Sequence, residues 1–229
     1  MNEKATQVKV NQVEKTAIIS LIQRMLFLFT KRTFDIFVSL IGCLFLLPIS
    51  IIVKISYMFH KDFNPVFFTQ DRIGKNGKNF KFYKFRSMVP NADEILFKLL
   101  KENKEMAKEY KINKKLENDP RITKIGKILR KTSLDELPQF INILKGDMSL
   151  IGNRPYLPRE KEDMILYFDN IVKTKPGLTG YWQVSGRSNL DFNQRMKLES
   201  YYSNYQSLKL DIKIFFKTIK VVLNGKDAK

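Results

Sequence analysis

Two adjacent carboxylates, Asp135 and Glu136, are the residues of this sequence whose types and setting best suit chemistry. Basic residues stand close to them along the chain: Lys127, Arg130, Lys131, Arg154 and Arg159. A carboxylate that attacks a phosphate needs the surrounding negative charge neutralised, which arginines and a divalent cation can do. Adjacent carboxylates together with phosphate oxygens suit Mg²⁺, which prefers hard oxygen ligands. The pair is therefore a candidate nucleophile and metal site, and the arginines are expected to hold the carboxylate ionised.

The same pair also has a purely structural interpretation. Ser133 stands three residues before Glu136, a spacing typical of a capping box at the start of a helix. Acidic residues are common in a first helical turn, where they rarely take part in catalysis. Pro138 suits a helix that begins near Asp135, and this would place the acids at a helix N-terminus, where a phosphate can also dock. The residues alone leave both interpretations open.

Segment 175–188 (KPGLTGYWQVSGRS) is a second candidate binding region. Its glycines and proline predict a shaped loop. Trp182 could stack on a base and Arg187 could hold a phosphate, although a tryptophan buried beside turns is the commoner outcome. Basic and aromatic residues also alternate over 80–86, which suits either base stacking or a half-buried strand beside a membrane or an active site.

Composition narrows the classes of function. The 229 residues include 41 Lys and Arg against 23 Asp and Glu, and the net charge of +18 calls for an anionic partner. That partner could be a nucleic acid, a phosphorylated substrate or an acidic membrane leaflet. The single cysteine, Cys43, excludes an internal disulfide, and the single histidine, His60, leaves poor material for zinc or serine-hydrolase chemistry.

Residues 36–53 form an apolar run of 18 positions, at the lower limit for a membrane-spanning helix. Pro48 lies inside the run and predicts a kink. Basic residues flank both ends, so the charge rule for orientation favours neither side. A kinked transmembrane anchor and a helix that enters and leaves by the same face are equally supported by these residues. The preceding apolar stretch, 18–29, predicts an interfacial helix rather than a second span.

The remaining pattern predicts a mainly helical α+β protein with a small sheet. A β-hairpin is expected over 65–87, with Asn76 and Gly77 in its turn. Helices are expected over 91–117, 121–131, 133–145, 159–172 and 206–223. In the last of these, lysines recur on one face opposite apolar residues, which predicts an amphipathic helix lying in the membrane interface.

Several motifs resemble, in type and order, those of the bacterial sugar transferase family, the monotopic phosphoglycosyl transferases. They are KRTFD (31–35), the proline-broken apolar run, FYKFRSM (82–88), LRKTSLDELPQFINILKGDMSLIGNRP (129–155) and KPGLTGYWQVSGRS (175–188). The resemblance implies a re-entrant membrane helix over 31–60, broken at Pro48, after an N-terminal extension over 1–30. It also implies a membrane-associated catalytic domain over 61–229, on the cytoplasmic face of the inner (plasma) membrane.

The resemblance implies a two-step reaction as well. Asp135 matches the family's nucleophile, which attacks the β-phosphate of a UDP-sugar, releases UMP and holds the phosphosugar until a polyprenyl (undecaprenyl) phosphate takes it. Glu136 matches the second acid of this dyad, and the two are expected to hold Mg²⁺, with Mn²⁺ as the alternative. The positions implied around the substrate are Arg130, Arg154, Arg187, Gln183, Trp182 and Arg86. Lys31 and Arg32 match the basic start of the membrane helix.

One position departs from the family pattern: Asn153 stands where many members have proline, before Arg154 and Pro155. Two other classes of function remain as alternatives, a membrane-tethered nucleic-acid-binding protein and a non-catalytic membrane scaffold. The partners we expect are a UDP-sugar, a polyprenyl phosphate and the lipid bilayer, and no nucleic acid. The sequence indicates neither the sugar nor the glycan pathway, and it leaves a homodimer open.

Overall fold

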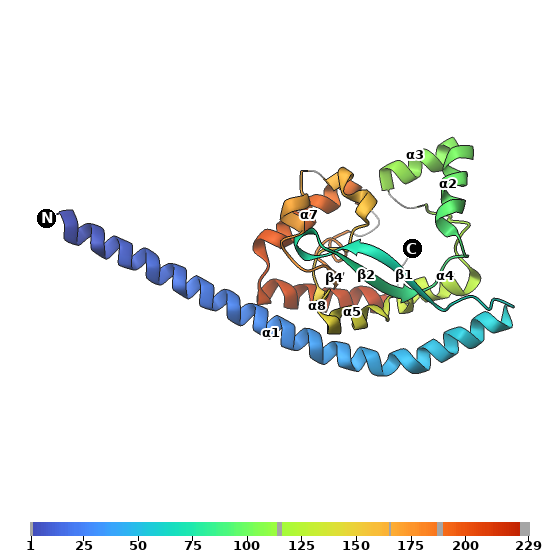
Figure 1. Ribbon diagram of the computed structural model, residues 1–229, viewed down its shortest axis with the longest axis horizontal. Coiled ribbons are helices and arrows are strands. Elements are labelled where there is room, and N and C mark those ends of the chain that lie inside the picture. The colour runs from blue at the N-terminus through green and yellow to red at the C-terminus, as the bar shows by residue number, and fades with distance from the viewer. Residues whose placement is uncertain (1, 114–115, 165, 187–189, 225–229) are drawn as a thin grey trace.

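A single long helix, α1 (Asn2–Phe59), forms the first quarter of the chain. The computed structural model describes residues 2–113, 116–164, 166–186 and 190–224. Figure 1 shows α1 as a bow whose concave side holds the rest of the molecule, and its first part extends beyond the other elements. Among the described residues, the segment Ala17–Phe59 is long and apolar enough to cross a membrane. At about 1.5 Å per residue its 43 residues span roughly 65 Å, twice the thickness of a bilayer's hydrocarbon core.

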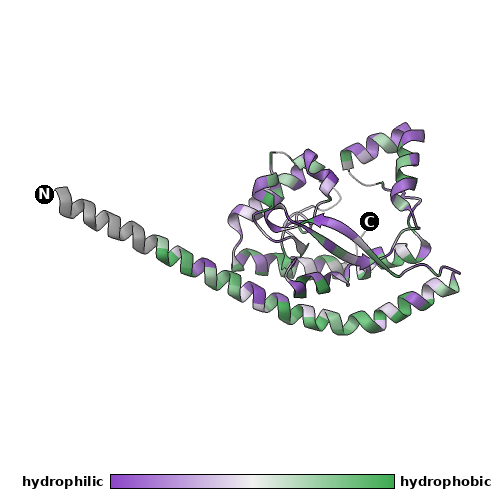
Figure 2. Cartoon of the chain, viewed as in Figure 1, coloured by the Kyte–Doolittle hydropathy of each residue, from purple (hydrophilic) through white to green (hydrophobic). Residues whose placement is uncertain are grey.

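The helix continues through Pro48, so the break predicted there is not an interruption of α1. Exposed apolar side chains are dense around this part of the bow, where Leu44 is 75% exposed and Leu47 is 70% exposed. Figure 2 shows the same predominance of apolar residues along this stretch. A re-entrant path through the membrane stays a prediction.

The predicted hairpin is confirmed as strands β1 (Phe67–Ile73) and β2 (Asn79–Phe85). The strands pair antiparallel, from Phe67 opposite Phe85 to Ile73 opposite Asn79. A short 3-10 turn, η1 (Lys75–Gly77), connects them, and it places Asn76 at φ 58° and Gly77 at φ 75°. These left-handed conformations are those that Asn-Gly pairs favour in tight turns, so the sequence signal has a direct physical cause.

The single helix predicted over 91–117 is wrong, because two helices, α2 (Ala92–Glu102) and α3 (Lys104–Asn113), form instead. Asn103 between them has an extended backbone. Its side-chain oxygen accepts hydrogen bonds from the backbone N–H groups of Glu105 and Met106. Asn103 therefore caps α3, which a count of helix propensities over the segment does not detect.

The helices around the acidic pair are shorter than predicted. Helix α4 (Lys124–Lys131) confirms the amphipathic helix, and the Thr123 hydroxyl caps it by accepting from the Gly126 N–H at 2.9 Å. The helix predicted over 133–145 is divided into a 3-10 turn, η2 (Leu134–Glu136), and helix α5 (Gln139–Lys145). Helix α5 ends at Gly146, whose φ of 88° is the usual glycine stop.

The second sheet was not predicted. Strands β3 (Ser149–Ile151) and β4 (Gly177–Thr179) pair in parallel. Between them, the helix predicted over 159–172 is replaced by three short pieces. These are η3 (Pro158–Glu160), η4 (Glu162–Met164) and α6 (Phe168–Ile171). Helix α7 (Phe192–Tyr205) follows, and α8 (Leu208–Asn224) confirms the predicted C-terminal helix.

Helix α8 packs one side on the domain and leaves two kinds of side chain exposed. Asp211 and Ile214 are buried. The exposed apolar side chains are Leu208, Ile212, Phe216 and Ile219, and the lysines beside them are Lys209, Lys213, Lys217 and Lys220. An apolar ridge flanked by lysines suits the boundary between lipid tails and anionic headgroups, as the sequence predicted.

Candidate active site

The loop that carries the acidic pair has an unusual backbone. Ser133 lies in the left-handed region at φ 56°, and its side chain makes no capping hydrogen bond. The Glu136 N–H donates to the Ser133 carbonyl oxygen at 3.3 Å, and the Ser133 N–H donates to Arg130 at 3.1 Å. The capping box suggested by the sequence is therefore wrong, because the hydroxyl of Ser133 does not serve the helix start. Non-glycine residues at positive φ are uncommon and concentrate at functional sites.

Apolar residues on each side of the pair fix its position. Leu134 and Leu137 pack against a buried cluster formed by Val53, Tyr57, Val66, Phe85, Ile125 and Leu129. This cluster draws on α1, the start of β1, β2 and α4. Asp135 and Glu136 lie between the two leucines and are half-buried. The acids are thus held where α1 and the hairpin meet.

Burial raises the pKa of the Asp135 carboxyl group above its ordinary value, and the charges of Lys84 and Arg130 offset this only in part. The loss of hydration therefore opposes the cations at this carboxyl group, and its ionisation by the arginines stays a prediction. A carboxylate that is poorly solvated and faces fixed cations is more basic than one in water. Such a group can act as a nucleophile toward a phosphorus atom whose charge the cations balance.

Lys84 on β2 is a candidate site residue that was not predicted. Burial, with Arg130 nearby, lowers the pKa of Lys84 to about 8, while Asp135 opposes this shift. Its ammonium lies 5.4 Å from the centre of the Phe68 ring. Lys84 shares a strand face with Phe82, which is buried, and a cation on the buried face of a strand is the signal that could have identified it.

Arg130 and Arg86 occupy different environments. Arg130, in the last turn of α4, is half-buried, and its Nε donates to Ser87 Oγ at 2.9 Å. The charges of Asp135 and Asp119 favour the charged form of Arg130, but burial still leaves its pKa below the ordinary value. Arg86 is 7% exposed; it donates to the Pro65 carbonyl oxygen and lies 2.9 Å from Asp62. Its guanidinium contacts therefore join the start of β1 to the end of β2, a positioning role.

A buried acid orders the loop that carries Arg154. Both carboxylate oxygens of Glu199, on α7, accept from the Arg154 N–H at 3.0 and 3.1 Å. Asn153 donates through Nδ2 to Ile171, Thr174 and Ser203. The side chain of Asn153 thus ties this loop to α6 and α7, which accounts for asparagine where proline is common. The Arg154 guanidinium lies 5.9 Å from the centre of the Tyr156 ring.

The 175–188 segment is described only in part. Trp182 is 8% exposed, and the Arg195 guanidinium lies 5.2 Å from its ring centre, so at least one face of the indole is covered. Gln183 is half-buried and donates to the Leu178 carbonyl oxygen at 3.5 Å. Arg187 lies outside the described residues. Roles for these three residues in binding a nucleotide stay predictions.

The KRTFD motif fastens α1 to the domain. Lys31 Nζ lies 2.6 Å from Asp211 of α8 and donates to the Ile151 carbonyl oxygen at 2.7 Å. Arg32 donates to the carbonyl oxygens of Ile143 and Leu144 at the end of α5. Asp35 accepts from Ser149 Oγ at 3.0 Å and from the Leu150 N–H at 2.8 Å. Lys31 also donates to the Tyr202 hydroxyl at 3.3 Å, so these two basic residues bind groups of α5, β3, α7 and α8.

The carboxylates of Asp135 and Glu136 suit a cation such as Mg²⁺ that takes few ligands from the protein. Among the described residues no group of three or more His, Cys, Asp or Glu side chains gathers to hold a metal ion. Mg²⁺ is usually bound by one or two carboxylates, with waters and substrate phosphates completing its coordination. The adjacent carboxylates of Asp135 and Glu136 fit that pattern, whereas an all-protein Ca²⁺ or Zn²⁺ cage does not fit these residues.

A half-buried pair of carboxylates beside fixed cations is suited to bind a phosphate, and comparison with known proteins assigns the family. The chain belongs to the bacterial sugar transferase family, which it matches over residues 26–225. This confirms the resemblance drawn from the motifs.

Several named relatives are similar in sequence to most of this chain. The undecaprenyl-phosphate galactose phosphotransferase of Salmonella typhimurium is 45% identical over 200 residues, which cover 87% of this chain and 42% of the relative. Galactosyl transferase CpsE of Streptococcus agalactiae is 47% identical over 205 residues, 88% of this chain and 44% of the relative. Exopolysaccharide production protein ExoY of Sinorhizobium fredii is 39% identical over 193 residues, which cover 84% and 85%. The chain thus spans less than half the length of the first two relatives and most of the third.

Proposed function

We propose that this chain transfers a sugar-1-phosphate from a UDP-sugar to a polyprenyl phosphate, undecaprenyl phosphate in the cell, and so initiates a surface glycan. The observation that carries the proposal is the half-buried Asp135 facing Lys84 and Arg130 in a member of the bacterial sugar transferase family. The names of two relatives, an undecaprenyl-phosphate galactose phosphotransferase and an exopolysaccharide production protein, support the acceptor and the role in glycan synthesis.

In the first step, a carboxylate oxygen of Asp135 attacks the β-phosphorus of the UDP-sugar. The bond between that phosphorus and the oxygen bridging to the α-phosphate breaks, and UMP leaves with the electron pair. The sugar phosphate remains on Asp135 as an acyl phosphate. In the second step, a phosphate oxygen of the polyprenyl phosphate attacks the same phosphorus, and the bond to Asp135 breaks. The lipid diphosphate sugar departs, and the carboxylate is restored.

Each neighbouring side chain has a role in this scheme. Lys84 and Arg130 balance the charge that builds up at the phosphorus, which is where preorganised cations act most strongly. Arg154 is suited to hold the nucleotide phosphate, and Glu136 assists the acceptor or a divalent cation. Bound Mg²⁺, or Mn²⁺ with its similar oxygen preference, would be held by Asp135 and Glu136 and would supply further neutralisation of the phosphates.

The contacts of α1 support a re-entrant arrangement in the plasma membrane. Lys31 and Asp35 bind the domain just before the apolar run 36–53, and Val53 and Tyr57 pack on it at the other end of that run. A helix that crossed the bilayer would carry one of these contact points to the far side. We infer that both flanks lie on the cytoplasmic face, with the apex of the bow in the lipid.

The test is release of UMP by purified protein, in detergent or nanodiscs, when a UDP-sugar and polyprenyl phosphate are both supplied. Asp135→Asn should lower turnover by at least about 10³-fold, because an amide is a poor nucleophile and carries no charge. Asp71→Asn is the matched control, since Asp71 pairs with the exposed Lys81 on the hairpin surface. Chelation by EDTA should also stop turnover, and Mg²⁺ should restore it. Normal turnover of a folded Asp135→Asn variant would refute the assignment.

The sugar is to be identified with a panel of donors. The name of the Salmonella typhimurium relative points to galactose, and that of a 34% identical relative from Aeromonas hydrophila points to N-acetylgalactosamine. UDP-galactose and UDP-N-acetylgalactosamine should therefore be compared with UDP-glucose and UDP-N-acetylglucosamine. A preference of at least about tenfold in kcat/KM would identify the donor.

A further inference from the structure

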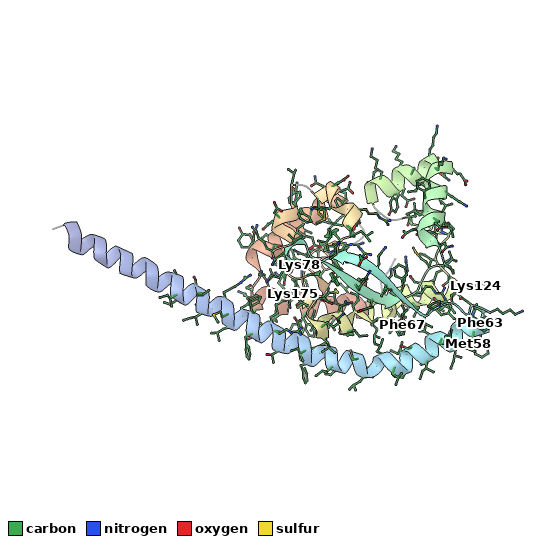
Figure 3. All side chains as sticks on the ribbon, viewed as in Figure 1. Met58, Phe63, Phe67, Lys78, Lys124 and Lys175 are labelled. Carbon is green, nitrogen blue, oxygen red and sulfur yellow. The ribbon has the colours of Figure 1, made fainter. Side chains whose placement is uncertain are left out.

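A groove of about 480 Å³ lies between the end of α1 and the start of β1. Side chains of α1 line one wall and the segment before β1 lines the other: Ile51, Lys54, Ile55, Pro65, Val66 and Phe67. Figure 3 labels Phe67 at the start of the hairpin and Met58 near the end of α1, the two elements that border the groove. Nothing in the reaction scheme above uses this groove.

The walls of the groove are apolar but remain open. Ile51 is 52% exposed, Ile55 is 47% exposed and Phe67 is 48% exposed. Large apolar side chains left open in this way favour an apolar occupant. Ile51 and Ile55 belong to the segment of α1 that faces lipid, so the groove is continuous with the membrane-facing surface. An occupant can therefore enter sideways from the bilayer without passing through water.

Cationic groups stand at both ends of the path from this groove to the reaction centre. Lys54, which donates to the Phe63 carbonyl oxygen at 3.4 Å, lines the groove itself. Lys84 and Arg130 face Asp135. A ligand with an apolar chain and an anionic head would match this distribution of charge.

The groove also leads toward the candidate nucleophile through direct contacts. Val66, in its wall, belongs to the buried cluster on which Leu134 and Leu137 pack. The Val66 carbonyl oxygen accepts from the Arg86 N–H at 2.7 Å. The next residue, Ser87, accepts from Arg130. One side of the groove is thus built from the same residues that hold the acidic pair.

We propose that the groove binds the phosphate-proximal isoprene units of the acceptor lipid, so that its phosphate is delivered to Asp135. This inference rests on the proposed function, because the acceptor is the lipid phosphate of the second step. A phospholipid of the bilayer is the competing occupant, but the reaction does not require its headgroup to reach Asp135.

Two neighbouring isoleucines allow a matched test. Ile51→Trp fills the groove from a position that is half exposed, so the fold is spared. Ile52→Trp adds the same bulk one residue along, at a side chain that is 62% exposed and does not line the groove. Ile51→Trp should raise the KM for polyprenyl phosphate by about tenfold or more, while single-turnover UMP release without acceptor stays within about twofold of wild type. Ile52→Trp should change neither value.

Equal KM values for the two variants would overturn the proposal, and so would a loss of UMP release in Ile51→Trp that matches its loss of transfer. A second measurement uses polyprenyl phosphate with a photoreactive diazirine on its first isoprene units. It should label peptides containing Ile55 or Phe67, and excess polyprenyl phosphate should prevent this labelling. Labelling that phospholipid prevents equally well would assign the groove to bilayer lipid and overturn the proposal. Failure of wild type to release UMP from any UDP-sugar would instead refute the proposed function, and the labelling would still decide the occupant.

Discussion

At the scale of single residues, burial and charge act against each other throughout the site. Asp135 faces two cations, yet burial raises the pKa of its carboxyl group. Lys84 faces a carboxylate, yet burial lowers the pKa of its ammonium to about 8. Both shifts reflect the free energy of removing a charge from water, which exceeds the benefit of a partner that is itself poorly hydrated. The substrate's phosphates would add the missing counter-charges and make the site complete.

Glu199 gives a prediction about stability and pH. Burial raises the pKa of Glu199 to about 8, and the Arg154 N–H and charge offset this only in part. The folded protein therefore keeps a proton that the unfolded chain releases above its ordinary pKa, which lies near 4.5. The contribution of protonated Glu199 to the free energy of unfolding is complete at low pH. It is lost as the pH rises to about 8, by at most about 1.4 kcal/mol per pH unit.

Glu199→Gln cannot titrate, so its stability should not follow this decline. We expect the free energy of unfolding of wild type to fall relative to Glu199→Gln as the pH is raised from 5 to 8, and the difference to level off above that. Thermal unfolding followed by the fluorescence of Trp182, the single tryptophan, provides the measurement. Parallel pH profiles for the two proteins would show that Glu199 is ionised in the folded state.

At the scale of secondary structure, the elements with regular periodicity were predictable and the short ones were not. The hairpin, α4 and α8 each carry several repeats of their pattern, and they form close to the predicted positions. Strands β3 and β4 have three residues each and pair across more than twenty intervening residues, so no local signal specifies them. The acidic pair was a candidate from its residue types and basic neighbours, and its roles were implied by the family resemblance, whereas Lys84 and Glu199 depend on which face of a strand or helix is buried.

Comparing Thr123 with Ser133 tests whether Ser133 caps a helix or only adopts a left-handed backbone in a turn. Thr123 caps α4 through its hydroxyl, and Thr123→Ala should cost about 1 kcal/mol of unfolding free energy. Ser133 makes no such bond, and Ser133→Ala should cost less than about 0.5 kcal/mol. Denaturant unfolding of both variants gives the comparison. A cost for Ser133→Ala as large as that for Thr123→Ala would restore the capping box.

The attachment of α1 can be tested at Lys31. Its ion pair with Asp211 is buried, so Lys31→Met leaves a carboxylate without its partner and should cost about 3–5 kcal/mol. Adding Asp211→Leu should recover much of this loss, because the unpaired charge is removed as well. Lys81→Met breaks the exposed pair with Asp71 and should cost less than about 1 kcal/mol. Equal losses for Lys31→Met and Lys81→Met would mean that the buried pair does not hold the helix.

At the scale of the whole molecule, the bow of α1 and the exposed ridge of α8 form the apolar surface that the proposed arrangement places against lipid. Figure 1 shows α8, α5 and α4 along the concave side of α1. The apolar surface of α1 is exposed over most of Ala17–Phe59, only a small share of which is buried by the domain. In the re-entrant arrangement proposed above, lipid covers this apolar surface, which accounts for the many exposed Ile, Leu and Phe side chains.

The position of the two ends of α1 follows from this arrangement. In a Cys43→Ser background, Lys15→Cys and Lys61→Cys each place one thiol beyond an end of the apolar segment. Both should resist a membrane-impermeant maleimide in intact cells and react in inverted membrane vesicles, because the proposed re-entrant arrangement places both on the cytoplasmic side. Labelling of either one from outside would indicate a transmembrane span in place of a re-entrant helix.

The most direct test of the account is a search for the covalent intermediate. Purified wild-type protein is incubated with Mg²⁺ and its UDP-sugar but without polyprenyl phosphate, quenched, digested and examined by mass spectrometry. The account predicts the mass of one sugar phosphate on the peptide that contains Asp135, its removal when polyprenyl phosphate is added, and no adduct in Asp135→Asn. Formation of the lipid-linked product by an enzyme that never carries the sugar phosphate, or an adduct at another residue, would contradict it.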